Sequence, residues 1–142
     1  MSDPSLALQD AVEQALRTDA GLLAAMETAK VRLYVMSAPV GAPYPYVVIG
    51  EDQVLDDATE CAESSEIYTT VHVWSRVDES VSASRRQAKA MAGAVRRALK
   101  FIAAVPGFDL VLAEFETTRH LTDPDGLTAH SVISHRFLLD PA

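Results

Sequence analysis

The chain has very little cysteine, and this scarcity excludes two kinds of site. Its 142 residues include a single cysteine, Cys61. One cysteine cannot close an intrachain disulfide, and it cannot build a zinc site that needs several thiolates. The acidic neighbours Asp57, Glu60 and Glu63 disfavour the thiolate that a nucleophilic cysteine requires. We therefore expect a reducing compartment and no catalytic role for this thiol.

Motifs of nucleotide-dependent enzymes and of serine hydrolases are also missing. The sequence contains no G-x-x-x-x-G-K-[ST], no G-x-G-x-x-G and no G-x-S-x-G. Its four histidines form no H-x-x-x-H pair, although a hairpin could bring His120 near His130. Carboxylate pairs such as Asp56 and Asp57 arise by chance in so acidic a chain. We expect no enzyme activity, no cofactor and no bound metal ion.

Basic residues are scarce relative to acidic ones. Twelve Lys and Arg face twenty Asp and Glu, which gives a net charge of −8. This balance opposes sequence-reading nucleic-acid binding, because such affinity depends on cations that neutralise phosphates. No apolar run approaches the length of a membrane span, and the N-terminal sequence lacks the features of a signal peptide. We expect residence in the cytoplasm, no membrane contact, and a surface past which DNA could slide.

A strand followed by a long helix, over residues 67–104, is the strongest structural signal. Odd-numbered apolar positions alternate with Tyr68, His72 and Trp74 along the strand, and the pattern predicts two bulky faces. If helices cover only the other face, these aromatic residues form a patch that needs a partner. The helix that follows carries one apolar stripe, with positions at Val81, Ser84, Ala88, Met91, Ala92, Val95, Leu99 and Ile102.

Helical spacing also predicts an N-terminal helix over roughly residues 4–18, with Asp3 as its N-cap and Pro4 at the first helical position. Residues 20–29 indicate a short second helix or a continuation bent at Gly21. Four further strands are expected, at residues 31–37, 46–51, 109–119 and 129–140.

These elements together predict one α+β domain over residues 1–142. Its sheet would be largely antiparallel or mixed, with about five strands, and would be packed by the N-terminal helix and the long central helix. A proline-rich irregular connection is expected at residues 38–45, and a type I turn at Asp123 to Gly126 would join the last two strands.

Two charge blocks flank the central strand. Residues 51–66 hold seven of the twenty acidic residues and no basic one, and residues 85–100 hold six of the twelve basic residues and no acidic one. The acidic block is a solvated loop, a pore-lining surface or a subunit contact, and the basic helix is a solvated face or a nucleic-acid patch. Candidate contacts with subunits or partners are Glu51, Asp52, Asp56, Asp57, Glu60, Trp74, Arg85, Arg86, Lys89, Arg96, Asp123 and Asp125.

Three segments, taken in order, resemble a known family. They are PYPYVVIGEDQ at 43–53, VHVWSR at 71–76 and RHLTDPDGLTAHSVISHRF at 119–137, with an alanine-rich helix between the last two. This order and spacing resemble the tail-completion or tail-terminator proteins of siphophages, prophages and gene transfer agents. The sequence departs from the family pattern in the length and acidity of residues 51–66.

The resemblance implies a structural assembly protein without catalytic residues. Such a subunit forms a ring, usually six-fold, at the head-proximal end of the tail tube, stops tube polymerisation and joins the tail to the head. The implied partners are further copies of itself, the tail tube protein and a head–tail connector or stopper protein, while DNA passes through without specific binding. The protein would act in the host cytoplasm during assembly and then in the particle. A small cytoplasmic binding domain, DNA-associated through residues 85–100, is the alternative, and an enzyme comes third.

Overall fold

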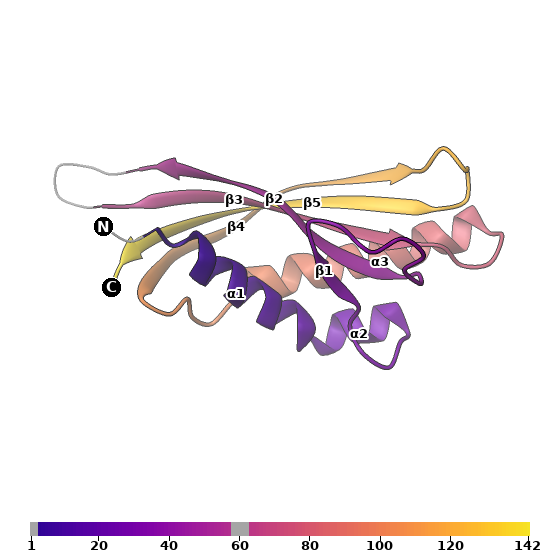
Figure 1. Ribbon diagram of the computed structural model, residues 1–142, viewed down its shortest axis with the longest axis horizontal. Helices are drawn as coiled ribbons and strands as arrows, with labels where there is room; N and C mark the ends of the chain where they lie inside the picture. The colour runs from indigo at the N-terminus through magenta and orange to yellow at the C-terminus, as the bar shows by residue number, and fades with distance from the viewer. Residues whose placement is uncertain (1–2, 58–62) are drawn as a thin grey trace.

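The computed structural model describes residues 3–57 and 63–142 (Figure 1). Three helices and five strands follow one another along these residues, and the order of elements agrees with the prediction. In chain order they are α1 (Ser5–Arg17), α2 (Ala20–Met26), β1 (Leu33–Val35), β2 (Tyr46–Asp56), β3 (Ser65–Ser75), α3 (Val81–Lys100), β4 (Phe108–Thr122) and β5 (Ala129–Pro141).

The strands form one mixed sheet in the order β1-β2-β3-β5-β4. The short strand β1 pairs in parallel with β2, and the other pairs are antiparallel. The α+β class with a mixed five-stranded sheet is therefore confirmed. Because β4 lies at the edge, one side of this 15-residue strand has no neighbour within the described sheet.

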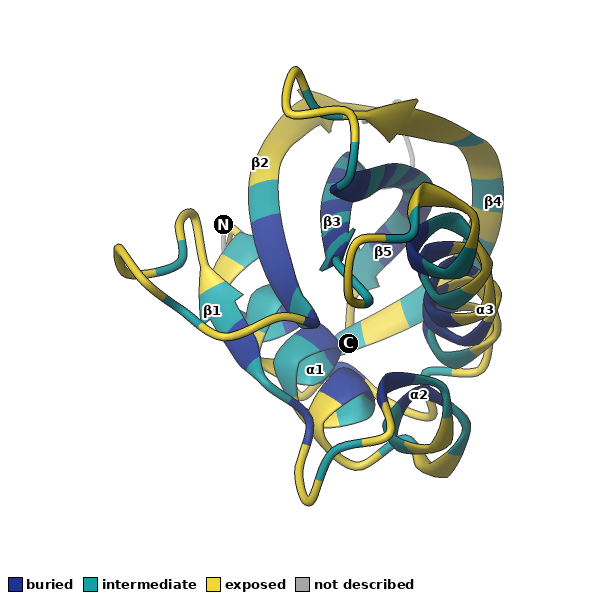
Figure 2. Ribbon diagram, turned by 90° about the vertical axis from the view of Figure 1, so that its right-hand side faces the viewer, coloured by how far each residue is buried: buried dark blue, intermediate teal, exposed yellow. Residues whose placement is uncertain are grey.

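All three helices lie against the same face of the sheet (Figures 1 and 2). On β3, Ile67, Val71 and Val73 are buried beneath them, and every second residue of β5 from Ala129 to Leu139 is buried as well. This is the alternation expected of a strand with one face in the core. None of the described helices lies over the opposite face of the sheet, which is the condition under which the sequence predicted an aromatic patch.

Capping residues account for where two of the helices begin. Ser80 accepts a hydrogen bond from the backbone N–H of Ala83 at the start of α3, and Asp19 accepts one from Leu22 at the start of α2. The expected N-cap of the first helix was wrong by one residue, since Pro4 precedes the helix and its fixed φ is compatible with that position. Asp3 still accepts a hydrogen bond from Ser5 N–H at 2.8 Å.

The apolar stripe of α3 is confirmed from Ser84 to Leu99 and is wrong at Val81, while Ile102 lies beyond the helix but still packs, partly buried, against the core. Val81 is 38% exposed, and the helix ends at Lys100, before Ile102. Leu99 is fully buried and provides the last core contact of the stripe within the helix.

The acidic block is not a 16-residue loop, and this expectation was wrong. Strand β2 continues to Asp56 and β3 begins at Ser65, with Asp56 and Ser65 in register. Backbone pairing can extend beyond the core because ladder hydrogen bonds do not require buried side chains, and Asp57 N–H donates to Ser64 O at 2.9 Å. The paired strands project at one end of the long axis, and β2 is exposed there (Figures 1 and 2).

Candidate assembly surfaces

The open face of the sheet carries a row of aromatic rings across neighbouring strands. Tyr46 of β2 lies opposite Trp74 of β3, which lies opposite His130 of β5. The Trp74 and His130 rings stack with centroids 3.6 Å apart, and Tyr44 and Tyr46 stack at 5.4 Å. Trp74 was predicted to lie on this face, and its position there is confirmed. The row is a large, partly exposed aromatic surface of the kind found in protein contacts.

A histidine pair extends this row. The His72 Nδ1 and His130 Nε2 atoms are 2.8 Å apart, and His72 Nε2 lies 3.7 Å from a carboxylate oxygen of Glu51. Gly50 permits this arrangement, because a Cβ there would be 2.8 Å from the His72 ring. Burial, and to a lesser degree the neighbouring His72, lower the pKa of His130 to about 4.

An ionic cluster occupies the other end of the open face. Arg136 of β5 donates to Glu66 at 2.6 Å and 2.9 Å, and its second terminal nitrogen lies 3.4 Å from Glu114. The hydrogen bond from Arg136 lowers the pKa of Glu66. Thus one end of this face is aromatic and the other is held by ion pairs.

Several basic residues of α3, Arg85, Lys89 and Arg96 among them, lie along the covered side of the edge strand β4, whereas the Arg97 guanidinium lies beside Gly21 of α2. Arg85 donates to Thr122 Oγ1 at 3.2 Å, and the Arg96 guanidinium lies 3.7 Å above the Phe115 ring. Two adjoining cavities between α3 and β4 share Gly93, Arg96 and Phe115, with volumes of about 400 Å³ and 670 Å³. Arg86 and Lys89 are exposed on the same helix. The predicted basic residues therefore form one surface, which we call the α3 basic face and define as Arg85, Arg86, Lys89, Arg96, Arg97 and Lys100.

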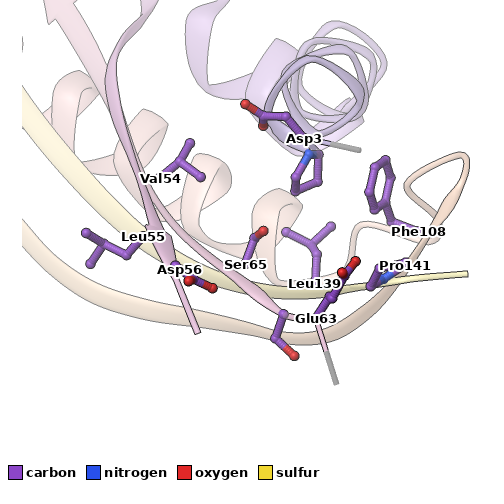
Figure 3. A pocket seen from close by; sticks show the side chains of 11 residues that line it. Asp3, Val54, Leu55, Asp56, Glu63, Ser65, Phe108, Leu139 and Pro141 are labelled. Carbon is purple, nitrogen blue, oxygen red and sulfur yellow. The ribbon is translucent and has the colours of Figure 1, made fainter. Parts of the chain in front are cut away.

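Among the acidic candidates, Asp56 and Asp57 lie at the projecting end of β2 and β3, whereas Glu51 lies beside His72. Glu51, Asp52, Asp56 and Asp57 are exposed, whereas Glu60 falls outside the described residues. A cavity of about 340 Å³ lies beside this segment (Figure 3). It is bounded by both ends of the chain and by the strand ends, and its lining consists of Asp3, Pro4, Val54, Leu55, Asp56, Glu63, Ser64, Ser65, Phe108, Leu139 and Pro141.

The turn between β4 and β5 is held together mainly by Asp125. Its carboxylate accepts hydrogen bonds from the N–H groups of Leu127 and Thr128 and from the Thr128 hydroxyl, which together lower its pKa to about 2. Gly126 N–H donates to Asp123 O at 2.9 Å, as the predicted type I turn requires. Burial and the neighbouring Asp125 raise the pKa of Asp123. Asp125 therefore has a local structural role, whatever else the turn contacts.

Sequence reasoning misjudged the histidines. His120 and His130 lie on opposite faces of the β4–β5 pair, because His120 is in register with Ser131 and donates to or accepts from its hydroxyl at 2.7 Å. His130 instead meets His72, a pairing that depends on the strand register and not on either local sequence. In the described part of the chain, no three His, Cys, Asp or Glu side chains come together as a possible metal site. Nor is any described helix long and apolar enough to cross a membrane.

The fold and the surfaces together define a class of protein. In the part described, it is a small α+β protein that presents extended surfaces of opposite charge and an uncovered sheet face. Comparison with known proteins gives the family. The model of the tail completion protein gp17 family matches residues 10–140, and this chain belongs to that family.

Individual relatives agree with the assignment. The chain is 30% identical over 99 residues to the tail completion protein gp17 of Bacillus phage SPP1, and the match covers 69% of each protein. It is also similar to a chain in the virion of a native gene transfer agent particle, with a TM-score of 0.81, 25% sequence identity and 99% coverage of both chains. The predicted resemblance is confirmed, and with it the assignment as a structural protein of phage-type tails that functions within a particle.

Proposed function

We propose that this protein is a tail terminator. Its subunits, each one tail-terminator-like domain, form a ring, six-fold as in the resemblance, at the head-proximal end of the tail tube. The ring stops tube polymerisation and joins the tail to the head connector or stopper protein. The observation that carries the proposal is the similarity along 99% of the chain to a component of an assembled gene transfer agent virion.

The charge distribution supports assembly through complementary surfaces. A ring subunit must present two different surfaces that fit each other. The projecting end of β2 and β3 is acidic and the α3 basic face is cationic, and the two blocks are similar in size. Exposed ion pairs contribute only about 0.2–1 kcal/mol each, so several must act together, and salt should weaken them.

The role also requires that the two faces of the ring differ. A ring that offered the tube's own repeat on both sides would let polymerisation continue. The acidic end of β2 and β3 and the turn containing Asp123 and Asp125 project at opposite ends of the molecule (Figure 1), and one of them contacts the tail tube protein in this proposal. With a net charge of −8, the protein lets DNA pass without specific binding. No catalytic step is proposed.

The decisive test is deletion of the gene in the strain that makes the particle. Electron microscopy should then reveal unjoined heads and tails of uncontrolled length, and infectivity or transfer should fall. Expression of the wild-type protein from a second locus should restore joined particles. Joined particles with tails of normal length in the deletion strain would overturn the proposed role.

A charge-reversal variant separates assembly from the DNA-binding alternative. Arg85→Glu, Arg86→Glu and Lys89→Glu together should weaken subunit assembly in analytical ultracentrifugation, most clearly at low salt. Lys30→Glu, an exposed cation in the connection after α2, is the control and should assemble normally. Assembly that persists in the triple variant while DNA binding is lost would favour the binding-domain alternative.

A further inference from the structure

The cavity beside the acidic end of β2 and β3 combines an apolar interior with a negatively charged rim (Figure 3). Phe108, Leu139 and Val54 contribute apolar surface, and the prolines at both ends of the chain close the sides. The carboxylates of Asp3 and Glu63 stand at the edge. Its volume of about 340 Å³ exceeds the roughly 150 Å³ that holds a benzene ring, so a phenylalanine side chain and part of a lysine stem would fit. Such a site favours an apolar group with a cation beside it.

The same chain carries a group of this description on another surface. Phe101 follows the last residue of α3 and is 70% exposed. Lys100 lies beside it, with its ammonium 5.8 Å from the Phe101 ring centroid, and Arg97 is one turn earlier on the helix. Phe101 is a lining residue of the two cavities that flank the C-terminal end of α3. Its side chain is enclosed by neither of them.

A subunit cannot place its own Phe101 in its own cavity. Phe101 lies with Ala11 and Gln14 of α1 and with Thr18 just after it, whereas Pro4, just before α1, lines the cavity. About ten residues of helix separate these positions, which corresponds to roughly 15 Å at 1.5 Å per residue. The exposed ring and the cavity that suits it can therefore meet only between two copies.

We propose that Phe101 of one copy inserts into the cavity lined by Phe108 and Leu139 of a second copy, with Lys100 and Arg97 facing the carboxylates of Asp3 and Glu63. This contact rests on the proposed function, because it supplies the join between neighbouring ring subunits. The occupant is a second copy, since the acidic rim repels nucleic acid and the exposed aromatic group is already flanked by matching cations. A buried aromatic anchor with charges at its rim is the usual arrangement of an interface hot spot.

Removal of the Phe101 side chain gives the first test. Phe101→Ala should raise the dissociation constant for subunit association at least tenfold in analytical ultracentrifugation, because interface anchors lose this much when removed. Its melting temperature should match the wild type, since the side chain is exposed in the monomer. Val40→Ala, which truncates an even more exposed apolar side chain elsewhere, should leave association unchanged. Equal association of F101A and V40A would overturn the contact.

A charge swap tests whether the two sites meet directly. Lys100→Glu and Glu63→Lys should each weaken association, and the double variant K100E/E63K should recover most of the loss. The control K30E/E63K should show no recovery, because Lys30 lies away from Phe101. A double variant as weak as either single variant would contradict direct contact.

Cross-linking within assembled particles covers the case of a protein that stays monomeric in solution. In a Cys61→Ser background, Lys100→Cys with Glu63→Cys and a short bismaleimide should give a ladder of covalent multimers, and either cysteine alone should not. A particle that contains the variant without this ladder overturns the contact while leaving the tail role intact. Normal tails in the deletion strain would instead overturn the tail role itself, so the two failures are distinguishable.

Discussion

The two faces of the sheet differ in what covers them and in what their side chains do. On the helix-covered face, Phe137, Ile133 and Val71 are fully buried and pack against other apolar side chains of the core. On the open face, Trp74, His130 and Arg136 are partly exposed and stack or pair with named neighbours. The buried side chains of the covered face therefore provide most of the stability of the fold. The partly exposed side chains of the open face can contact other molecules.

Each face also holds a histidine whose pKa is lowered to about 4, and the causes differ. His135 is fully buried between Phe115 and Phe137, with neither ring nitrogen hydrogen-bonded among the described residues, and Arg96 adds a smaller repulsion. His130 is only partly buried, stacks on Trp74 and has His72 as a polar partner. Burial is the larger cause in both, but only His130 retains a hydrogen bond.

The largest effect should come from the covered face. Phe137→Ala removes a fully buried ring, and we expect the free energy of unfolding to fall by about 3–5 kcal/mol in urea titrations. Leu138→Ala, the next residue on β5 but on the open face, should cost much less. Similar losses from F137A and L138A would contradict the assignment of the two faces.

On the open face the largest loss should come from Trp74. Trp74→Ala removes stacking on both His130 and Tyr46, and we expect a loss of about 1–2 kcal/mol with an unchanged circular dichroism spectrum. Thr70→Ala, on the same strand and face but outside the aromatic row, should change stability by less than about 0.5 kcal/mol. A loss from W74A as large as that from F137A would mean that the row is part of the core.

Much of this distinction could be predicted from the sequence. Period-two alternation placed Val71 and Trp74 on opposite faces, because side-chain direction in a strand is a local property. Three other features depend on contacts between distant segments and could not be predicted. They are the face of the sheet that the helices cover, the register that joins His72 to His130, and the continuation of β2 into the acidic block. A charged segment has no apolar alternation, so its strand character left no signal in the sequence.

The exposed cavity and Phe101 escaped prediction for a related reason. Phe101 reads as the continuation of a helix whose stripe was expected to reach Ile102, and only the observed end at Lys100 reveals that its side chain points away from the core. The cavity is assembled from both chain ends and two strand ends, so no single stretch of sequence contains it. The two charge blocks, by contrast, could be recognised in the sequence, because each is a property of one continuous stretch of residues.

Replacing the buried histidine should stabilise the protein. His135→Leu removes two buried ring nitrogens that have no hydrogen-bond partner among the described residues, and we expect a gain of about 1 kcal/mol in the free energy of unfolding at pH 7. Because the pKa of His135 is about 4 when folded and 6.5 is its ordinary value, the unfolded chain binds a proton first as the pH falls. Wild-type stability should thus decline between about pH 6.5 and 4 and stay level above, and H135L should flatten part of this decline. His120→Leu, which leaves the buried Ser131 hydroxyl without its described partner, should show no gain.

The smallest effect should be the contribution of His130 to the same acid decline. Its pKa is also lowered to about 4, so the sign is the same, and His130→Gln should remove part of the loss of stability between pH 6.5 and 4. That part should be smaller than the part removed by H135L, because solvent near the partly exposed His130 screens its charge and the His72 nitrogen can reorient toward it. The two causes can be separated by NMR titration of the His130 ring. His72→Gln removes the repulsion but leaves the burial beneath Trp74, so the pKa of His130 should rise only part of the way toward 6.5. A full return to 6.5 in H72Q would assign the shift to the histidine pair, and the open face would then differ from the covered one in the cause of its shift as well as in its exposure.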